Sequence, residues 1–372
     1  MRPWKRIVLN TLRPIDRFYD QFKFHFKKLL RIGNGTPITI INYRSYGTSD
    51  KVVVKGRVIK QVLIKTRRED SKWKNFQNNL RRFLSTKVAN AELEIKINEE
   101  IFAIKTDKEG YFDLSTSLKN HFSPLKKDWR NIEVNLVNTP LKKLEVQSQS
   151  EILIPQKGNY GIISDIDDTI LQTDVTSLLK LRMLYLTFLK NAFNRNVFKE
   201  AKAFYNALQK GASGEARNPI FYVSNGPWNL YDFLVVFLRI NGLPKGPILL
   251  RDFGIPRQRV PRNYQGHKKE SIKKIMNTYP QLPFVLIGDS GEKDTDVYLA
   301  LAKEFPGRIK SIYIRDVESP RRAKRIAQLI KNASSIDAYF VKDYFQAAKY
   351  ASKKGYLHFD TFKSFRKESR KS

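Results

Sequence analysis

The chain has 372 residues, which is long enough for two domains that each bury a substantial core. It holds 69 Lys and Arg against 36 Asp and Glu, a formal net charge of +33, and it has no Cys, which excludes disulfides and thiolate metal sites. No run of about 18 uncharged apolar residues occurs, so no bilayer-spanning helix is expected, whereas the positive charge predicts attraction to anionic membranes or anionic polymers.

Residues 1–34 are predicted to form a basic amphipathic arm. Apolar side chains recur at helical spacing between residues 15 and 30, with basic residues on the other faces. Such a helix would lie in a membrane interface or pack its aromatic stripe on the body of the protein, and the pattern does not distinguish the two. Arg13, Pro14 and Asp16 interrupt the first apolar stretch, so no secretory signal peptide is expected.

Residues 35–155 are predicted to form a β-sandwich-like domain, because apolar and polar side chains alternate with a period of two. The predicted strands are residues 38–41, 52–59, 91–97, 101–106, 111–114, 132–137 and 151–154. The turn at Gly110 is similar to that of transthyretin-like or carboxypeptidase regulatory-type sandwiches. A helical insertion near residues 72–84 is expected to pack on the sandwich, with membrane contact as the alternative.

Residues 161–170 form the most informative segment, because a short apolar strand there ends in three acids. Asp165 and Asp167 project to the same side of the strand, since side chains alternate. Two carboxylates this close require a cation between them or a shared proton. This pattern predicts a divalent metal site in which one carboxylate is the nucleophile and its neighbour the acid/base. The alternative is that the acids cap the next helix, which is the role expected for Asp168.

From residue 156 onward, strands alternate with helices, which predicts an α/β domain over 156–345 with a parallel sheet covered on both faces. The predicted strands are residues 161–165, 220–224, 247–250, 284–288, 310–315 and 338–341. The long connection at about 171–215 is expected to be a helical cap over the site, or else an ordinary helical hairpin buried on the sheet. Residues 346–372 are expected to be a solvated basic tail.

Three further segments place polar side chains at the ends of predicted strands or at the start of a helix. In chain order they supply Ser224 with Asn225, Lys268, and Asp289 with Asp294. Acid, hydroxyl, lysine and acid in this order are the groups that phosphoryl transfer uses. The metal and the lysine neutralise phosphate oxygens, the serine donates a hydrogen bond, and Asp165 attacks in line.

These segments resemble the haloacid dehalogenase superfamily and, within it, the actin-patch-associated phosphatidate phosphatase family. The resemblance rests on Asp165–Thr169, Tyr222–Asn225 with Pro227–Tyr231, Gly288–Glu292 with Asp294, and Ile312–Val317. It covers about residues 155–345 and implies a Rossmann-like haloacid dehalogenase domain with a helical cap. Gly226 departs from the family's pattern, where a Ser is expected.

The resemblance also implies roles for the matched residues. Asp165 would be the nucleophile that forms a phosphoaspartyl intermediate, and Asp167 the acid/base that protonates the leaving alkoxide and then activates water. Lys268 would stabilise the charge on the nucleophile and the phosphate. The implied phosphate-binding residues are Thr169, Ser224, Asn225 and Lys268.

The implied cofactor is Mg²⁺, which prefers an all-oxygen shell. Its implied ligands are Asp165, Asp167, Asp289 and Asp294. With only four His and no Cys in the chain, a multi-His or thiolate zinc site is excluded. His267, next to Lys268, is expected to be structural, and Trp228 with Tyr231 is expected to lie in the buried stripe of a helix rather than at a substrate entrance.

Together these features predict a magnesium-dependent phosphatidate phosphatase that acts on a phospholipid substrate at an anionic membrane surface. Nucleic-acid termini or nucleotides are an alternative substrate class, supported by the net charge alone and not favoured. A non-catalytic basic membrane-binding protein is the alternative of another class, against which the filled catalytic positions argue. The expected localisation is cytoplasmic, peripheral at the inner membrane surface, and no protein partner is indicated.

Overall fold

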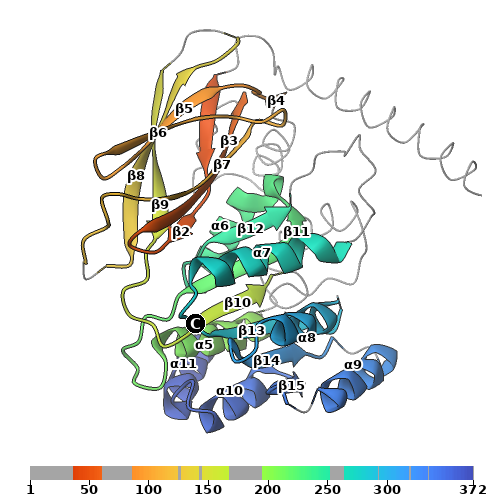
Figure 1. Ribbon diagram of the computed structural model, residues 1–372. Helices are drawn as coiled ribbons and strands as arrows, with labels where there is room; N and C mark the ends of the chain where they lie inside the picture. Colours follow the sequence, from red (N-terminus) through yellow and green to blue (C-terminus); the bar gives the residue numbers. More distant parts are fainter. Residues whose placement is uncertain are drawn as a thin grey trace, which may run out of the picture.

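The computed structural model describes residues 37–60, 86–124, 127–141, 145–166, 195–251, 264–291, 293–317, 320–333 and 335–371. Two sheets organise this part of the chain (Figure 1). The predicted arm at 1–34, the predicted helical insertion near 72–84 and residues 171–194 of the predicted cap lie outside the described residues.

The second sheet contains six parallel strands in the order β12-β11-β10-β13-β14-β15. They are β10 (Gly161–Asp165), β11 (Ile220–Pro227), β12 (Ile248–Arg251), β13 (Phe284–Asp289), β14 (Ile309–Arg315) and β15 (Ala338–Val341). These bounds confirm the predicted α/β fold with a parallel sheet. Every residue of β10 and β13 is buried, as expected for central strands that are covered on both faces.

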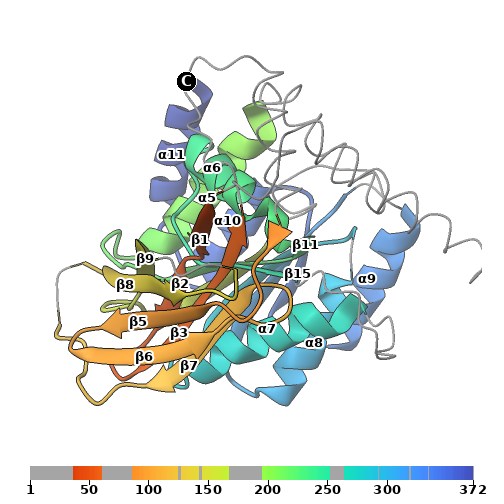
Figure 2. The same ribbon diagram turned by 90° about the horizontal axis from the view of Figure 1, so that it is seen from above.

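Helices cover both faces of this sheet (Figures 1 and 2). The described helices are α5 (Arg195–Lys210), the short 3-10 turn η1 (Trp228–Leu230), α6 (Tyr231–Ile240), α7 (Tyr264–Thr278), α8 (Asp294–Glu304), α9 (Pro320–Asn332), α10 (Tyr344–Lys353) and α11 (Phe359–Lys371). Alternation along β10 assigns the faces: Ile162 packs with residues of α5, α6 and α10, and Ile163 with residues of α7 and α8.

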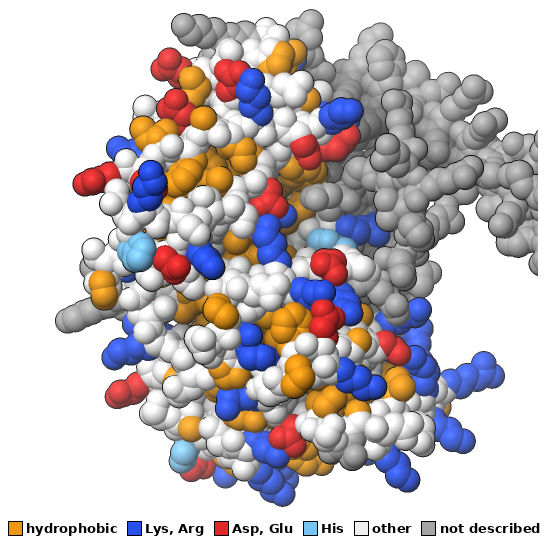
Figure 3. Space-filling model, in the orientation of Figure 1, with side chains coloured by type: hydrophobic (Ala, Val, Ile, Leu, Met, Phe, Trp, Pro, Cys, Tyr) orange, Lys and Arg blue, Asp and Glu red, His pale blue; other side chains and the backbone are white. Residues whose placement is uncertain are grey.

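Basic side chains are distributed over the surface of both sheet regions rather than only at the ends of the chain (Figure 3). Acidic side chains on the same face are scattered among them. Of the helices in the described part of the chain, none combines the length and the apolar character needed to cross a bilayer.

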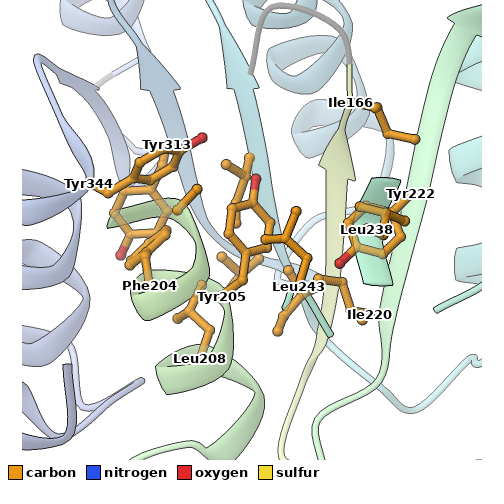
Figure 4. Packing of buried hydrophobic residues seen from close by; sticks show 14 of the residues in the cluster. Ile166, Phe204, Tyr205, Leu208, Ile220, Tyr222, Leu238, Leu243, Tyr313 and Tyr344 are labelled. Carbon is orange, nitrogen blue, oxygen red and sulfur yellow. The ribbon is translucent and has the colours of Figure 1, made fainter. Parts of the chain in front are cut away.

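Helix α5 packs on the parallel sheet. It is the one helix that the structure describes within the predicted cap segment at about 171–215. Its residues Phe204, Tyr205 and Leu208 are fully buried against Tyr313 and Tyr344 (Figure 4). For α5, the packing therefore agrees with the second expectation for this segment, a helix buried on the sheet, and not with a cap over the site. The helix ends where Gly211 adopts a left-handed φ of 66° and donates to the carbonyl of Ala207.

The first sheet is formed by the β-rich segment that precedes the parallel sheet. Its strands are β1 (Ile38–Asn42), β2 (Ser45–Gly47), β3 (Lys51–Lys60), β4 (Thr86–Lys87), β5 (Glu92–Ile97), β6 (Glu100–Lys105), β7 (Tyr111–Ser117), β8 (Trp129–Asn138) and β9 (Val146–Leu153). β3 pairs with β1, β2, β4 and β7, which makes a branched sheet of nine strands. The predicted strands are found, and the sandwich arrangement stays a prediction.

Two sets of buried side chains join the first sheet to the region of the parallel sheet. Tyr43 stacks on Trp228, with 4.0 Å between ring centroids, and the backbone N–H of Arg44 donates to the hydroxyl of Tyr231. Trp228 and Tyr231 are therefore buried, which confirms the expected structural role for this aromatic pair. On the other face, Tyr46 of β2 packs against Phe221 with 5.6 Å between centroids.

The C-terminal segment differs from the expected solvated tail. α11 packs on α5, the side chain of Phe362 is completely buried, and Arg366 forms an ion pair with Glu200 at 2.6 Å. The segment was expected to be solvated because of its many charges. Phe359 and Phe362 nevertheless lie one turn apart and give the helix an apolar face.

Candidate active site

The strand order places the candidate site at a topological switch point. From β10 the chain proceeds to β11 and β12 on one side of the sheet, and then to β13, β14 and β15 on the other. In α/β sheets, ligands bind outside the carboxyl ends of the strands at such a point. Asp165 pairs in register with Val223 of β11, and Ser164 with Ile287 of β13. Ser224 and Asp289 therefore end at the same edge as Asp165.

Lys268 joins two of the predicted carboxylates. It lies in the second turn of α7, its side chain is 2% exposed, and its Nζ donates to Asp165 Oδ1 at 2.8 Å. The same ammonium donates to Asp294 Oδ1 at the start of α8. Asp165, from the end of β10, and Asp294 are both buried. The lysine therefore compensates part of the negative charge of two acids that are far apart in the chain.

Asp289 completes a group of three buried carboxylates. Ligand oxygens of Asp165, Asp289 and Asp294 all lie within 4.8 Å of one another. The side chain of Asp289 accepts from the backbone N–H of Gly291, which orients it. Three carboxylates and one ammonium leave an excess of negative charge in a buried site, which a divalent cation would offset.

This donor set fits Mg²⁺. The ion takes oxygen ligands at about 2 Å in an octahedral shell, so opposite ligands lie roughly 4 Å apart. The observed carboxylate spacing is close to that requirement. The geometry therefore brings together three of the four predicted metal ligands. The fourth, Asp167, lies outside the described residues, as do Asp168 and Thr169.

Gly288 allows Asp294 to approach β13 closely. A Cβ at this position would lie 2.6 Å from Asp294 Oδ2 and 2.9 Å from the ring of Tyr298. Tyr298 is buried beneath the site and donates to the carbonyl of Ile287. Burial, and then the charge of Asp294, raise the pKa of Tyr298, so its hydroxyl stays protonated. The steric requirement at Gly288 depends on how α8 packs on β13, which the local sequence pattern does not indicate.

Ser224 and Asn225 lie in the carboxyl-terminal half of β11, the strand next to β10. Ser224 is buried, and its Oγ accepts from the backbone N–H of Gly226 at 2.9 Å. A Cβ on Gly226 would lie 3.0 Å from that Oγ, so a glycine leaves room around the serine hydroxyl. The departure from the expected Ser at position 226 thus changes the immediate surroundings of Ser224.

A buried pair of hydroxyls beneath Asp165 was not found from the sequence. Ser164 Oγ lies 2.7 Å from the hydroxyl of Tyr205 and donates to the carbonyl of Asp165 at 2.7 Å. Burial raises the pKa of Tyr205, so it remains a neutral partner. Ser164 was read as one residue of an apolar strand, and the Tyr205 partner comes from α5, so only the three-dimensional structure reveals the pair.

His267 is next to Lys268 in the chain, but its ring is surrounded by positive charges and not by the carboxylates that Lys268 contacts. Burial, followed by the positive charges of Lys55, Arg251 and Lys268, lowers the pKa of His267 to about 4. Its Nε2 is 3.4 Å from the hydroxyl of Ser271 one turn along α7. A neutral imidazole in this position agrees with the expected structural role.

The fold and the site together define an α/β protein with a carboxylate and lysine centre at the switch point of a parallel sheet. Comparison with known families is consistent with this class. Residues 160–316 match the family model described as "Phosphatidate phosphatase APP1, catalytic domain". Over this segment, which is less than half of the chain, the sequence is similar to that family.

Two curated relatives resemble the chain over the same region. It is 29% identical over 237 residues to "Phosphatidate phosphatase APP1" of Saccharomyces cerevisiae, which covers 63% of this chain and 39% of the relative. It is 30% identical over 220 residues to an uncharacterized protein of Schizosaccharomyces pombe, covering 59% of this chain and 35% of the relative. The chain thus spans well under half the length of these relatives.

A carbohydrate acetylesterase from Xanthomonas citri aligns over 82% of this chain and 68% of its own, at 10% identity and a TM-score of 0.28. A score this low does not indicate a shared fold.

Proposed function

We propose that the chain is a magnesium-dependent phosphatidate phosphatase that converts phosphatidate to diacylglycerol and phosphate through a phosphoaspartyl intermediate. The observation that supports this most directly is the buried group of Asp165, Asp289 and Asp294 with Lys268 between two of them. The match of residues 160–316 to a family model described as a phosphatidate phosphatase catalytic domain supports the proposed substrate class.

Asp165 is the proposed nucleophile. Its Oδ1 accepts from Lys268, which orients the carboxylate for attack on phosphorus. Attack forms the aspartyl oxygen–phosphorus bond while the bond from phosphorus to the glycerol oxygen breaks. The ammonium of Lys268 and the hydroxyl of Ser224 then lie near the edge where negative charge develops on the transferring group.

Asp167 is proposed as the acid/base on the strength of its position two residues after Asp165. It would protonate the departing glycerol oxygen and then take a proton from the water that hydrolyses the aspartyl phosphate. Thr169 and Asn225 are proposed to hold the loop and the phosphate. The helical cap predicted at about residues 171–215 and the sandwich arrangement of the first sheet belong to the same proposal.

Asp165, Asp289 and Asp294 are the described residues that would hold Mg²⁺, with Asp167 as the fourth proposed ligand. When bound, the ion supplies positive charge that offsets the phosphate and carboxylate charges as they approach each other. The residues of the chain orient the phosphate and move the protons.

The proposed place of action is an anionic membrane surface, with the protein peripheral and cytoplasmic. A net charge of +33 supports this, because each Lys or Arg near an acidic bilayer contributes about 1 kcal/mol of attraction. Phosphorylated nucleic-acid termini remain an alternative substrate class that the same charge would attract.

The decisive experiment measures magnesium-dependent phosphate release from phosphatidate vesicles by the wild-type protein and by Asp165→Asn. The variant keeps the size of the side chain but is a poor nucleophile, so release should fall at least about a thousandfold. Asp296→Asn is the matched control, because Asp296 lies on α8 and pairs with Arg325 outside the carboxylate group. Full activity in Asp165→Asn would reject the mechanism, and preferred release from 5′-phosphorylated oligonucleotides would reject the substrate.

A further inference from the structure

One exposed side of α9 carries basic side chains that have no ion-pair or hydrogen-bond partner in the described part of the chain. Arg321, Lys324 and Lys331 are exposed and lie within one side of the helix, opposite the buried Ile326. Within the described part of the chain, no ion pair or side-chain hydrogen bond involves these three residues. We refer to Arg321, Lys324 and Lys331 as the α9 stripe.

Other basic residues of the same helix have structural partners. Arg322 donates to the carbonyl of Gly291 at 2.9 Å, and Arg325 forms two hydrogen bonds with Asp296 of α8, at 2.6 and 3.1 Å. No acid occurs in α9 to balance the stripe. Arg321 and Lys324 lie three residues apart, where like charges repel on a helix, and an anionic partner would offset that repulsion.

The position of α9 relates the stripe to the candidate active site. Gly291, the partner of Arg322, follows Asp289 in the loop that leads to Asp294. In both ribbon views α9 lies on the side of the molecule toward which the arrow of β11 points (Figures 1 and 2). The space-filling view shows Lys and Arg side chains projecting from the corresponding edge (Figure 3). The helix therefore begins next to the carboxylate group.

We infer that the α9 stripe docks the protein on the anionic surface of a lipid bilayer and so brings the carboxyl edge of the parallel sheet to its substrate. The inference deepens the proposed function and rests on it for the choice of a lipid surface. Apart from Pro320 and Ala327, the exposed residues of α9 have basic or amide side chains, so the stripe offers no large apolar group for insertion. Contact is electrostatic and lies at the level of the headgroups.

The chemistry of the stripe favours a bilayer over nucleic acid. Single strands bind to proteins that combine basic grooves with aromatic platforms on which bases stack. The stripe has no aromatic residue and lies on a convex helix surface. A fluid layer of anionic headgroups needs neither a groove nor a stacking platform, because the lipids rearrange around the charges.

The test compares two triple variants of the full chain that change the net charge equally. The first, Arg321→Gln with Lys324→Gln and Lys331→Gln, removes the stripe. The control, Lys96→Gln with Lys108→Gln and Lys119→Gln, removes three exposed lysines of the first sheet region that have no side-chain ion pair in the described structure. Co-sedimentation is measured with phosphatidylcholine vesicles that contain about a quarter phosphatidylserine.

The stripe variant should bind roughly a hundredfold more weakly, about fivefold for each charge removed, whereas the control should change by about threefold or less. Hydrolysis of a soluble aryl phosphate should be the same in both variants as in the wild type, which shows that folding and chemistry are intact. Raising the salt concentration should weaken vesicle binding by the wild type more than by the stripe variant.

Unchanged vesicle binding by the stripe variant would overturn the inference, and so would an equal loss in both variants. The inference would also be wrong if the stripe variant lost affinity for an oligonucleotide but bound vesicles as well as the wild type does. A wild-type protein that binds vesicles through the stripe but releases no phosphate from phosphatidate would leave the docking surface in place and reject the proposed function.

Discussion

The ammonium of Lys268 lies between Asp165 and Asp294 in a fully buried position, so its loss should affect stability as well as chemistry. Lys268→Met should lower the free energy of unfolding by about 3–5 kcal/mol without magnesium, because buried carboxylates lose their partner. Magnesium should then raise the melting temperature more in the variant than in the wild type, since ion binding offsets the excess negative charge.

Thermal unfolding with and without magnesium measures both effects. Lys274→Met is the control, because Lys274 lies on the same helix but forms only a surface ion pair with Asp113, worth less than about 1 kcal/mol. An equal response to magnesium in Lys268→Met and the wild type would contradict the proposed charge balance.

His267 should make the stability depend on pH. Its pKa is about 4 in the folded protein and 6.5 in an unfolded chain, so the unfolded state binds more protons between these values. Above pH 6.5 the residue is neutral in both states and has no effect. As the pH falls from 6.5 toward 4, the folded state loses about 1 kcal/mol per pH unit, reduced to the extent that solvent reaches the ring.

Chemical denaturation of the wild type and of His267→Gln at several pH values isolates this contribution from that of the carboxylates. The difference between the two proteins should grow as the pH falls from 6.5 to 4 and be constant above 6.5. A constant difference across the whole range would show that the ring titrates normally.

At the scale of elements, Gly288 allows side chains of α8 to approach β13 closely. Gly288→Ala places a methyl group 2.6 Å from Asp294 Oδ2, so the acid must move away from the carboxylate group. We expect weaker magnesium binding, at least about tenfold lower activity and a stability loss of roughly 1–3 kcal/mol. Magnesium titration followed by activity measures the first two effects.

Gly266→Ala is the matched control for this substitution. Gly266 lies in α7 with no atom within 4 Å of its added Cβ, so alanine should stabilise the helix by up to about 1 kcal/mol and leave magnesium binding unchanged. If both variants lowered magnesium affinity alike, the steric explanation for Gly288 would be wrong.

The parallel strands and the residues at their ends were predictable because a strand buried on both faces appears in the sequence as a continuous apolar run. β10 and β13 are continuous apolar runs that end in Asp165 and Asp289. Parallel pairing brings such ends together, so the three described carboxylates and Lys268 follow from local pattern and fold class. Asp167 and Thr169 stay predictions.

Other features depend on contacts between residues far apart in the chain, which no local sequence pattern indicates. β2 was missed because it has three residues, Ser45–Gly47, all buried and without alternation. α11 was expected to be solvated because its charges obscure the apolar pair Phe359 and Phe362. The Ser164–Tyr205 hydroxyl pair joins residues 41 positions apart, and no local pattern indicates it.

At the scale of the whole molecule, the first sheet and the parallel sheet share buried clusters and should unfold together. Tyr46 packs on Phe221 and Tyr279 across the boundary. Tyr46→Ala should destabilise the protein by about 3–5 kcal/mol and keep a single unfolding transition, because the core is continuous. Differential scanning calorimetry measures both quantities.

Ile101→Ala is the control, since Ile101 lies on the same sheet but is 62% exposed. It should change stability by less than about 0.5 kcal/mol. Two separate transitions in Tyr46→Ala, one of them unchanged from the wild type, would show that the two regions fold independently and that their contact is incidental.

The hydroxyl of Tyr160, just before β10, donates to the carbonyl of Tyr356, 196 residues later in the chain. Phe204 and Tyr205 of α5 likewise pack on Tyr344. During synthesis, the central strand is therefore made long before the residues that cover one of its faces. A nascent chain paused ahead of α10 would expose this aromatic surface at the ribosome, and we expect such chains to aggregate or to recruit chaperones until α10 and α11 emerge.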